Sequence, residues 1–319
     1  MELITVIVPA YNAQKSIKKC LTSILENTVE GHRYNLELIV VNNGSTDDTE
    51  LIVRRMANDD NRIKLICQEN RGPAGSRETG LQNAKGDYIA WCDSDDWVEP
   101  DWLDSMFLYL KKYNADISVC RPQITNHKNL DDPEKIWEWD HDEVVELFLK
   151  QELFTGALWN KLIKRELFSD LHFRLRYWED MDVLWDVLKR TKKVVRFNQE
   201  KYHWVIHEES YCAKTISQAR LNSSFTMWDK VCKDCAEVDD LKKFSELANF
   251  EKMNWLYGEL KLMCRDDYHD EKVERQIQLL LRKEGLPGIR KMSGMKDKLF
   301  AIAVICNLKL ARVIYKKAI

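Results

Sequence analysis

The segment of the chain best suited to chemistry is acidic. Residues 86–110 contain seven acidic side chains and no Lys or Arg. Three of the carboxylates, Asp93, Asp95 and Asp96, follow directly on the apolar run 88–92. Like charges this close raise the free energy unless a proton, solvent or a cation neutralises them. Oxygen ligands with room for water suit Mg²⁺ or Mn²⁺, which would share its coordination with a substrate phosphate. The alternative is an Asp-rich turn, in which Asp96 is only a helix cap.

Two further segments carry groups that suit a phosphate or a hydroxyl. Arg77 follows a glycine-rich turn at residues 70–76, where a guanidinium can meet a diphosphate. The alternative there is a surface arginine. Glu179 and Asp180 follow the mixed segment 173–177. A carboxylate at that place could serve as a general base or could be part of a solvated helix start.

The first half of the chain has the pattern of a sheet that could position these groups. Short apolar runs, rich in β-branched and aromatic residues, lie at residues 4–8, 36–41, 63–67 and 88–92. Several lack polar alternation, so we expect both faces of the sheet to be covered. Stretches with helical signals separate the runs: Ile17, Leu21, Ile24 and Leu25 share one stripe, and residues 45–48 have the form of a capping box.

This alternation predicts a mostly parallel α/β sheet with right-handed crossovers. In such sheets, ligands bind beyond the carboxyl ends of the strands. The acidic segment after residue 92 and the polar residues after the first two runs lie at those positions. The sequence therefore predicts a site at one edge of the sheet.

The last third of the chain has a different pattern. From about Ser217, long stretches of helical periodicity dominate, with a break predicted at residues 285–288. We therefore expect an α/β domain at residues 1–215 and a smaller, all-α domain at 216–319. A Cys-x-x-Cys pair at Cys232 and Cys235 has no second pair at zinc-site spacing, which favours a structural role.

The segment 295–317 is predicted to be a single basic amphipathic helix. Lys298, Lys309, Arg312 and Lys316 fall on one helical face, with apolar residues over much of the rest. Such a helix can lie on an anionic membrane surface, or it can pack on its own domain or on a second subunit. Its longest apolar run, residues 299–306, is far shorter than the roughly 20 residues of a membrane span.

The amino-acid composition excludes several classes of protein. The 319 residues are 45% hydrophobic, with 49 basic and 52 acidic side chains, which excludes a disordered chain and an integral membrane protein. The near-neutral balance argues against a nucleic-acid partner. The N-terminus does not resemble a signal peptide, and nine cysteines without a framework spacing suit a reducing compartment. We expect a cytoplasmic protein, at the cytoplasmic face of a membrane if the tail binds lipid.

Together, these segments resemble the family 2 glycosyltransferases of the GT-A fold, a Rossmann-like, mostly parallel nucleotide-sugar domain. The resemblance covers about the first 215 residues and depends on the order and spacing of several short motifs. They are Pro9-Ala10-Tyr11-Asn12, Val41-Asn42-Asn43-Gly44-Ser45, Asn70-x-Gly72 through Ser76-Arg77, Asp93-Ser94-Asp95-Asp96, Trp159-Asn160-Lys161-Leu162, Glu179-Asp180, and His207 before Ser210.

The resemblance implies an inverting, metal-dependent enzyme that moves a hexosyl or N-acetylhexosaminyl group from a nucleoside-diphosphate donor, expected to be a UDP-sugar. The acceptor would be a hydroxyl of a saccharide, polyol phosphate or lipid-linked molecule in cell-surface polysaccharide synthesis. Asp180 would be the base and Glu179 would orient the acceptor beside Trp159. Asp95 and His207 would hold Mn²⁺ or Mg²⁺. The nucleotide would contact Pro9, Tyr11, Asn42, Asn43, Arg77, Asp93 and Ser94.

Two features depart from the family pattern. Asn42 and Asn43 replace the usual acidic pair, although an amide oxygen can still accept from a uracil N–H. Val205 stands where an arginine often precedes the late histidine, so one diphosphate contact is expected to be missing or supplied from elsewhere.

Two other functions are compatible with a sheet of this kind. A sugar nucleotidyltransferase would need a glycine-rich loop after the first strand, and residues 9–14 contain no glycine. A non-catalytic module that binds sugar nucleotides or polysaccharide is the remaining alternative. In that case the two asparagines would mark decay of the donor site, but Asp93, Asp95 and Asp180 argue against it.

Overall fold

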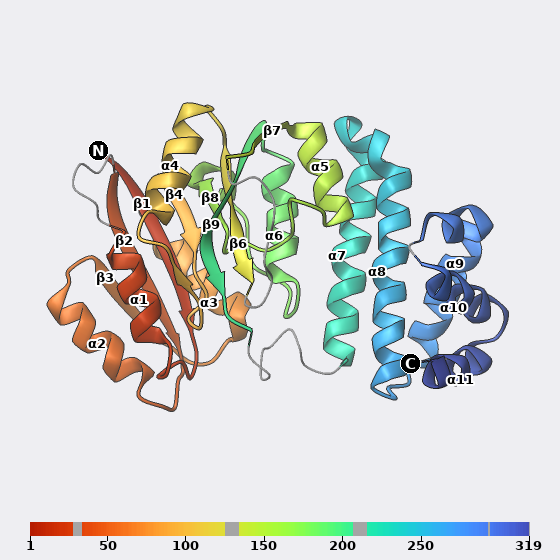
Figure 1. Ribbon diagram of the computed structural model, residues 1–319. Coiled ribbons are helices and arrows are strands. Elements are labelled where there is room, and N and C mark those ends of the chain that lie inside the picture. Colours follow the sequence, from red (N-terminus) through yellow and green to blue (C-terminus); the bar gives the residue numbers. More distant parts are fainter. Residues whose placement is uncertain (28–33, 125–133, 207–215, 293, 319) are drawn as a thin grey trace. The chain divides into compact units, whose positions relative to one another are not determined.

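The four apolar runs of the first half all form strands close to their predicted positions in the computed structural model (Figure 1). The strands are β1 (Glu2–Ala10), β2 (Tyr34–Asn43), β3 (Ile63–Gln68) and β4 (Tyr88–Trp91). The structure describes residues 1–27, 34–124, 134–206, 216–292 and 294–318. Within these ranges the chain divides into two compact units, residues 1–208 and 209–319. The predicted boundary after residue 215 adjoins residues outside the described ranges and stays a prediction.

The sheet of the first unit is mixed but mostly parallel. The order of its strands is β3-β2-β1-β4-β8-β6-β9-β5, and β7 also pairs with β9. The later strands are β5 (Trp97–Val98), β6 (Ile117–Ile124), β7 (Ile136–Asp140), β8 (Lys161–Lys164) and β9 (Lys193–Trp204). Strands β1 to β4, β6 and β9 run the same way, whereas β5, β7 and β8 run antiparallel to their neighbours.

Helices cover both faces of this sheet, as the continuous apolar runs predicted (Figure 1). The helices of the first unit are α1 (Ile17–Leu25), α2 (Thr49–Asp59), α3 (Gly72–Asn83), α4 (Trp102–Lys112), α5 (His141–Lys150) and α6 (Glu179–Leu188). Side chains from α1, α2 and α4 pack with Val6 and Val8 of β1 in one core. On the other face, Gly80 of α3 lies so close to Ile7 that a Cβ atom there would be 2.3 Å from Ile7 Cγ2.

The order of strands creates a switch point between β1 and β4. From β1 the chain moves outward to β2 and β3, and then returns to place β4 on the other side of β1. Ile7 of β1 pairs with Trp91 of β4, so Pro9 and Asp93 end up at the same edge of the sheet. In open α/β sheets this crevice is where ligands bind. The predicted location of the site therefore agrees with the topology.

The predicted capping box at residues 45–48 is wrong. Helix α2 begins at Thr49, and its N-cap residue, Asp48, makes no side-chain capping bond. Asp47 instead accepts hydrogen bonds from the backbone N–H and hydroxyl of Thr49 and from the backbone N–H of Gln14. Asp47 thus joins the loop before α2 to the loop after β1, because Gln14 in that second loop supplies a backbone N–H donor.

Every regular element in the described residues of the second unit is a helix. It contains α7 (Gln218–Glu237), a 3₁₀ turn (Asp239–Phe244), α8 (Ser245–Arg265), α9 (Glu271–Lys291), α10 (Met295–Cys306) and α11 (Leu308–Ala318). None of its described helices, nor any in the described part of the first unit, combines the length and apolarity needed to cross a bilayer.

Two expectations for the second unit were wrong. Helix α9 runs through the predicted break at residues 285–288 and ends at Lys291. Ile289 and Met292, just beyond that stretch, are buried in the core, and such burial can outweigh weak helix propensity. The tail is two helices instead of one, because Asn307 is extended (φ −157°) and its side chain accepts from Leu310 N–H at 3.1 Å.

Candidate active site

The loops after β1 and β2 are tied together at the edge of the sheet. Asn12 has a left-handed backbone (φ 49°), a conformation that asparagine tolerates better than most residues. Its backbone N–H donates to Ser45 Oγ at 3.0 Å, and its side-chain oxygen accepts from Thr46 N–H at 2.8 Å. Tyr11, directly before it, is 50% exposed, and Pro9 is half-buried. The predicted nucleobase contacts are therefore accessible at this edge.

The two asparagines after β2 are buried and hold the same loops. Asn42 donates to Glu50 at 3.0 Å and accepts from Ser45 N–H at 3.2 Å. Asn43 accepts from the Gln68 side chain and from Arg71 N–H, and its amide donates to Asn70 and to the Gly72 carbonyl. A nucleobase contact from either side chain stays a prediction. It would require one of these hydrogen bonds to be replaced by a hydrogen bond to the base.

Arg77 brings together the acids that lie far apart in the sequence. It comes from α3 and is 7% exposed. Its Nη2 donates to Asp93 Oδ1 at 2.9 Å and its Nη1 donates to Glu179 Oε1 at 2.8 Å. Burial alone would lower the pKa of Arg77, but the carboxylates of Asp93 and Glu179 raise it above its ordinary value. The guanidinium thus joins the end of β4 to the start of α6.

The start of α6 is held in an uncommon backbone conformation. Trp178, directly before Glu179, has a left-handed backbone (φ 61°), which is rare for a bulky residue. Such conformations persist only where the surroundings impose them, and they cluster at functional sites. The turn places Glu179 against Arg77 and Asp180 at the N-terminus of the helix, where Asp180 Oδ1 accepts from Met181 N–H at 2.8 Å.

The cluster carries more negative than positive charge. Burial raises the pKa of Glu179 to about 7, with Arg77 opposing the shift and Asp180 adding to it. Burial also raises the pKa of Asp180, with Arg77 and the Met181 N–H acting the other way. Both shifts mean that this edge of the sheet stabilises an added positive charge or proton.

Lys161 interacts with this cluster through Asp180, although its sequence position indicates no role beyond its place in a short motif. It is completely buried at the start of β8, and its Nζ donates to the Ala157 carbonyl at 2.5 Å and to Asn160 Oδ1 at 2.8 Å. Burial lowers the pKa of Lys161 to about 7, while the carboxylate of Asp180 favours its charged form. The signal for it in the sequence is its place in the Trp159-Asn160-Lys161-Leu162 motif, directly before the apolar residues Leu162 and Ile163.

Asp96 and Tyr202 brace the acidic turn from the other side. Tyr202 OH donates to Asp96 Oδ2 at 2.7 Å and accepts from Asp93 N–H at 3.1 Å, and Val205 N–H donates to Asp96 Oδ1 at 2.8 Å. Burial, together with the charge of Asp93, raises the pKa of Asp96 to about 8. The interpretation of Asp96 as a helix cap is wrong, because the turn folds it inward against β9.

Trp159, the predicted acceptor residue, is partly buried. Its ring stacks on Tyr202 with 4.7 Å between centroids and lies 6.0 Å from that of Trp204. Its contact with an acceptor stays a prediction.

The predicted metal ligands are one exposed carboxylate and one residue outside the described ranges. Asp95 is exposed on the turn after β4, beside Ser94, which is half-buried. His207 lies among residues 207–215. Within the described part of the chain, no three His, Cys, Asp or Glu side chains gather to hold an ion by themselves. Asp93 Oδ1 is paired with Arg77, and its side chain is still 33% exposed. Exposed carboxylates in an acid-rich turn fit a divalent ion that takes further ligands from a phosphate.

Comparison with known proteins agrees with this geometry. The family model described as Glycosyl transferase family 2 matches residues 5–172. Glycosyltransferase GlyA of Streptococcus pneumoniae is 36% identical over 65% of this chain and 31% of its own length. Chondroitin synthase of Pasteurella multocida is 24% identical over 93% of this chain and 30% of its own length. The chain thus spans about a third of these two relatives.

Solved structures share the fold at low sequence identity. Residues 1–349 of S. aureus TarS, in complex with UDP-GlcNAc, superpose with a TM-score of 0.71 at 16% identity, covering 100% of this chain and 91% of that one. A mannosyltransferase of Pyrobaculum calidifontis, in complex with GDP-Man and Mn²⁺, gives a TM-score of 0.57 at 18% identity, covering 98% and 86%. The likeness confirms the predicted fold class, including the helical region after the sheet.

Proposed function

The chain belongs to glycosyl transferase family 2, and on that premise we propose that it transfers a sugar from a nucleoside-diphosphate donor to an acceptor hydroxyl. The observation that carries the proposal is the ion-paired cluster in which Arg77 joins Asp93 and Glu179 next to Asp180. It lies at the switch point of the sheet, where a nucleotide is expected. TarS, a neighbour in fold, is known in complex with UDP-GlcNAc, which supports a UDP-sugar.

Asp180 is the proposed base. A carboxylate that accepts the proton of the attacking hydroxyl accelerates transfer by about 10²–10⁴-fold. Its pKa lies above that of an ordinary aspartate because of burial, which strengthens it as a base, while Arg77 and Lys161 favour its ionised form. One base and one in-line attack would invert the anomeric carbon. Glu179, held by Arg77, would fix the start of α6 and orient the acceptor.

A divalent cation is the proposed partner of the acidic turn. When bound, such an ion stabilises the charge that develops on the leaving diphosphate. Asp95 would hold it from its exposed position, with Asp93 beside it and His207 as a further proposed ligand. Arg77 keeps Asp93 oriented, and Ser94 and Tyr11 would contact the nucleotide. The mannosyltransferase that shares the fold is known with Mn²⁺ and GDP-Man, which supports this assignment.

The acceptor is proposed to be a growing saccharide or a lipid-linked molecule, with Trp159 near it. The resemblance to chondroitin synthase supports a role in polysaccharide synthesis. A lipid-linked acceptor would place the chain at the cytoplasmic face of a membrane as a peripheral protein. Apolar side chains exposed on the second unit support that placement.

Replacement of Asp180 tests the base. Asp180→Asn should lower turnover with a UDP-sugar and acceptor by about 10²-fold or more, because the hydroxyl keeps its proton. Titration of UDP should give a nearly unchanged dissociation constant. Asp186→Asn, on the same helix but ion-paired with Lys189 at 2.7 Å, is the matched control and should retain activity. Full turnover in Asp180→Asn excludes the role.

Replacement of Asp95 tests the cation. In the native chain, Mn²⁺ should strengthen UDP binding measured by calorimetry, because the ion links carboxylate to diphosphate. Asp95→Ala should remove that dependence, whereas Asp87→Ala, an acid outside the proposed ligand set, should keep it. Metal-dependent UDP affinity that survives in Asp95→Ala contradicts the assignment.

A further inference from the structure

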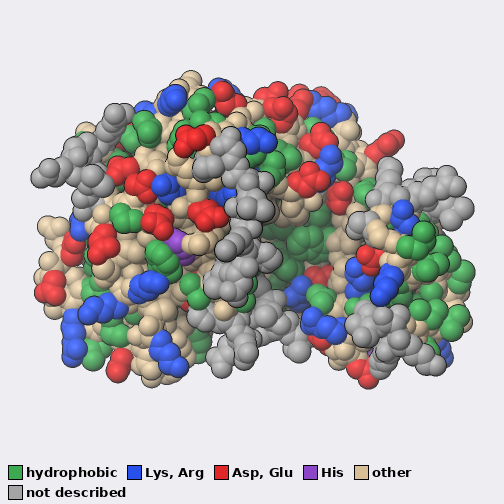
Figure 2. Space-filling view, viewed as in Figure 1, with side chains coloured by type: hydrophobic (Ala, Val, Ile, Leu, Met, Phe, Trp, Pro, Cys, Tyr) green, Lys and Arg blue, Asp and Glu red, His purple; other side chains and the backbone are tan. Residues whose placement is uncertain are grey.

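The second unit exposes an unusual amount of apolar surface. Seven of the fourteen large hydrophobic side chains that are exposed among the described residues lie between positions 279 and 314. They are Leu279, Met295, Leu299, Ile302, Leu310, Val313 and Ile314. Figure 2 shows apolar side chains gathered over this unit with Lys and Arg among them. Clustered exposure of this kind marks an interaction surface.

The two tail helices are apolar on both their inner and outer faces. In α10, Phe300, Ala301 and Val304 are buried in the core of the unit. Met295, Leu299 and Ile302, at spacings of four and three residues, are 73%, 59% and 41% exposed. An ordinary surface helix is polar on the side that faces solvent. The outer face of α10 is therefore built to contact something other than water.

Helix α11 repeats the arrangement. Ala311 is 1% exposed and belongs to the core, whereas Leu310 and Val313 are 53% and 50% exposed. We name the exposed residues Met295, Leu299, Ile302, Leu310, Val313 and Ile314 the apolar ridge.

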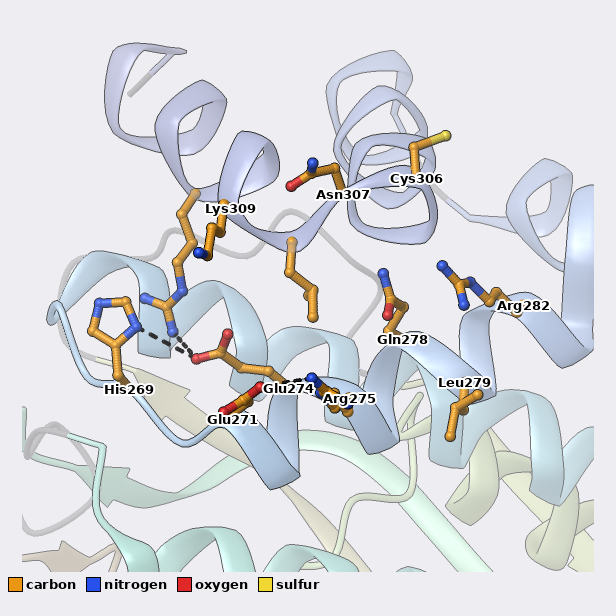
Figure 3. Close-up of a pocket in the computed structure, with 12 residues that line it drawn as sticks. His269, Glu271, Glu274, Arg275, Gln278, Leu279, Arg282, Cys306, Asn307 and Lys309 are labelled. Carbon is orange, nitrogen blue, oxygen red and sulfur yellow. Dashed lines mark hydrogen bonds and ion pairs between the residues drawn. The ribbon is translucent and has the colours of Figure 1, made fainter.

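A basic pocket lies beside this ridge. A cavity of about 720 Å³ opens where α9 faces the junction of α10 and α11 (Figure 3). Figure 3 shows Arg275 and Arg282 on α9 and Lys309 at the start of α11. Four cations, Arg275, Arg282, Lys309 and Arg312, line it against two acids, Glu271 and Glu274. The pocket therefore keeps a positive surplus.

Part of this donor capacity is unused. Arg312 is 8% exposed, and its Nε and Nη1 have no hydrogen-bond partner among the described residues. Its Nη2 donates to the Tyr268 carbonyl at 2.7 Å and contacts Glu274. Buried donors are nearly always bonded, so unpaired ones beside a cavity indicate a ligand oxygen or water.

The wall of the pocket is held in place before any ligand arrives. Gln278 donates to the carbonyl of Val304 at 2.7 Å, and Arg282 donates to that of Ile305 at 2.8 Å. These bonds fix the end of α10 against α9. A preorganised wall loses little entropy on binding.

We propose that the apolar ridge and this pocket dock the chain on an anionic phospholipid bilayer, with a headgroup phosphate in the pocket. The ridge would enter the boundary between headgroups and acyl chains. From residue 289 to the end there are eight Lys and Arg and one acid, Asp297. Two copies of so basic a segment would repel each other, which favours an anionic membrane over a second copy. The inference builds on the proposed membrane placement but does not depend on the chemistry at Asp180.

Flotation of the full chain with vesicles tests the surface. The chain should float with vesicles that contain phosphatidylglycerol and should remain at the bottom of the gradient with vesicles of pure phosphatidylcholine. Added salt should weaken the binding, because it screens the charges. Lys309→Gln and Arg275→Gln should each lower partitioning about fivefold, since each charge near an anionic surface contributes about 1 kcal/mol. Leu299→Ser with Ile302→Ser should lower it further, because the ridge loses its apolar contact.

Matched controls separate this surface from general charge. Lys233→Gln and Lys242→Gln remove exposed positive charges that lie outside the ridge and the pocket, and should leave flotation nearly unchanged. Every variant should keep its thermal stability, and every variant should still release UDP from the donor in the absence of acceptor. Loss of vesicle binding can therefore be told apart from loss of the proposed transferase activity.

Three outcomes overturn the proposal. One is a full chain that does not float with anionic vesicles. Another is a native chain that does not float with vesicles but self-associates in sedimentation experiments, with variants of the apolar ridge remaining monomeric. The third is thermal stabilisation by inorganic phosphate without vesicle binding, which would make the pocket a site for a free anion.

Discussion

Each unit of the molecule buries an arginine against carboxylates, and the two sites differ in charge balance. In the helical unit, Arg220 Nε donates to Glu259 at 2.9 Å, and Ser224 Oγ donates to the same carboxylate. Arg220 and Glu259 form a close ion pair there, with side chains that are 10% and 3% exposed. In the α/β unit, Arg77 contacts both Asp93 and Glu179, with Asp180 adding a further negative charge nearby.

The difference distinguishes a paired arginine from the cluster for which we propose a function. A buried ion pair is tolerable when its charges balance and its hydrogen bonds are made. A buried surplus of one sign is unfavourable by itself and shifts pKa values towards the neutral form. Burial, together with the neighbouring carboxylates, raises the pKa values of Glu179 and Asp180. The surplus is the feature that a bound cation would relieve.

The largest effect is expected from breaking the balanced pair. Glu259→Gln should lower the stability of the helical unit by about 3 kcal/mol, because Arg220 loses the carboxylate it contacts in a buried site. Urea unfolding followed by circular dichroism measures this. A loss well below 1 kcal/mol would show that the pair is dispensable and weaken the comparison.

The matched change in the unbalanced cluster should be much milder. Glu179→Gln should change stability at pH 7 by less than about 1 kcal/mol, since Arg77 keeps Asp93 and the amide oxygen can still accept from it. Activity should nevertheless fall, because the start of α6 loses its charged anchor. If Glu179→Gln destabilises the chain as much as Glu259→Gln, the two sites are energetically alike.

The pH dependence of stability sharpens the same contrast. The pKa of Glu179 is raised from 4.5 to about 7 in the folded state, so the folded chain holds this proton more tightly than the unfolded chain. Its stabilising contribution is present below about pH 4.5 and is lost as pH rises through 7. Thermal unfolding of the α/β unit should show this decline between those values. Glu179→Gln should flatten it, and Mn²⁺ with UDP should oppose it.

The smallest effect is expected at Lys161. Its positive charge lowers the pKa of Asp180, so Lys161→Met should move the acidic limb of the kcat/KM profile to higher pH. Lys161→Arg, which keeps the charge, should leave the limb near its native position. A merely structural lysine would lower activity at all pH values alike, and that result would exclude an electrostatic role.

The sequence by itself determined the first four strands of the sheet and the edge at which we propose the site. Apolar runs without polar alternation are a local signal, and so is the position of polar residues after them. For that reason β1 to β4 followed from the sequence, and the order of short motifs indicated the family. The structure brings Arg77, Asp93 and Glu179 into contact. Asp95 and Asp180 were predicted on the same basis, and their roles remain to be tested.

Only the tertiary structure decided how the side chains are partnered. Asp96 points inward because Tyr202, more than a hundred residues away, donates to it. Arg77 contacts Glu179 across 102 positions, Lys161 is buried near Asp180, and Asn307 divides the tail where periodicity predicted one helix. Spacing and periodicity depend only on residues of the same segment, so they predict local structure. Charge balance and burial depend on neighbours that arrive from distant segments, and those arise only when the chain is folded.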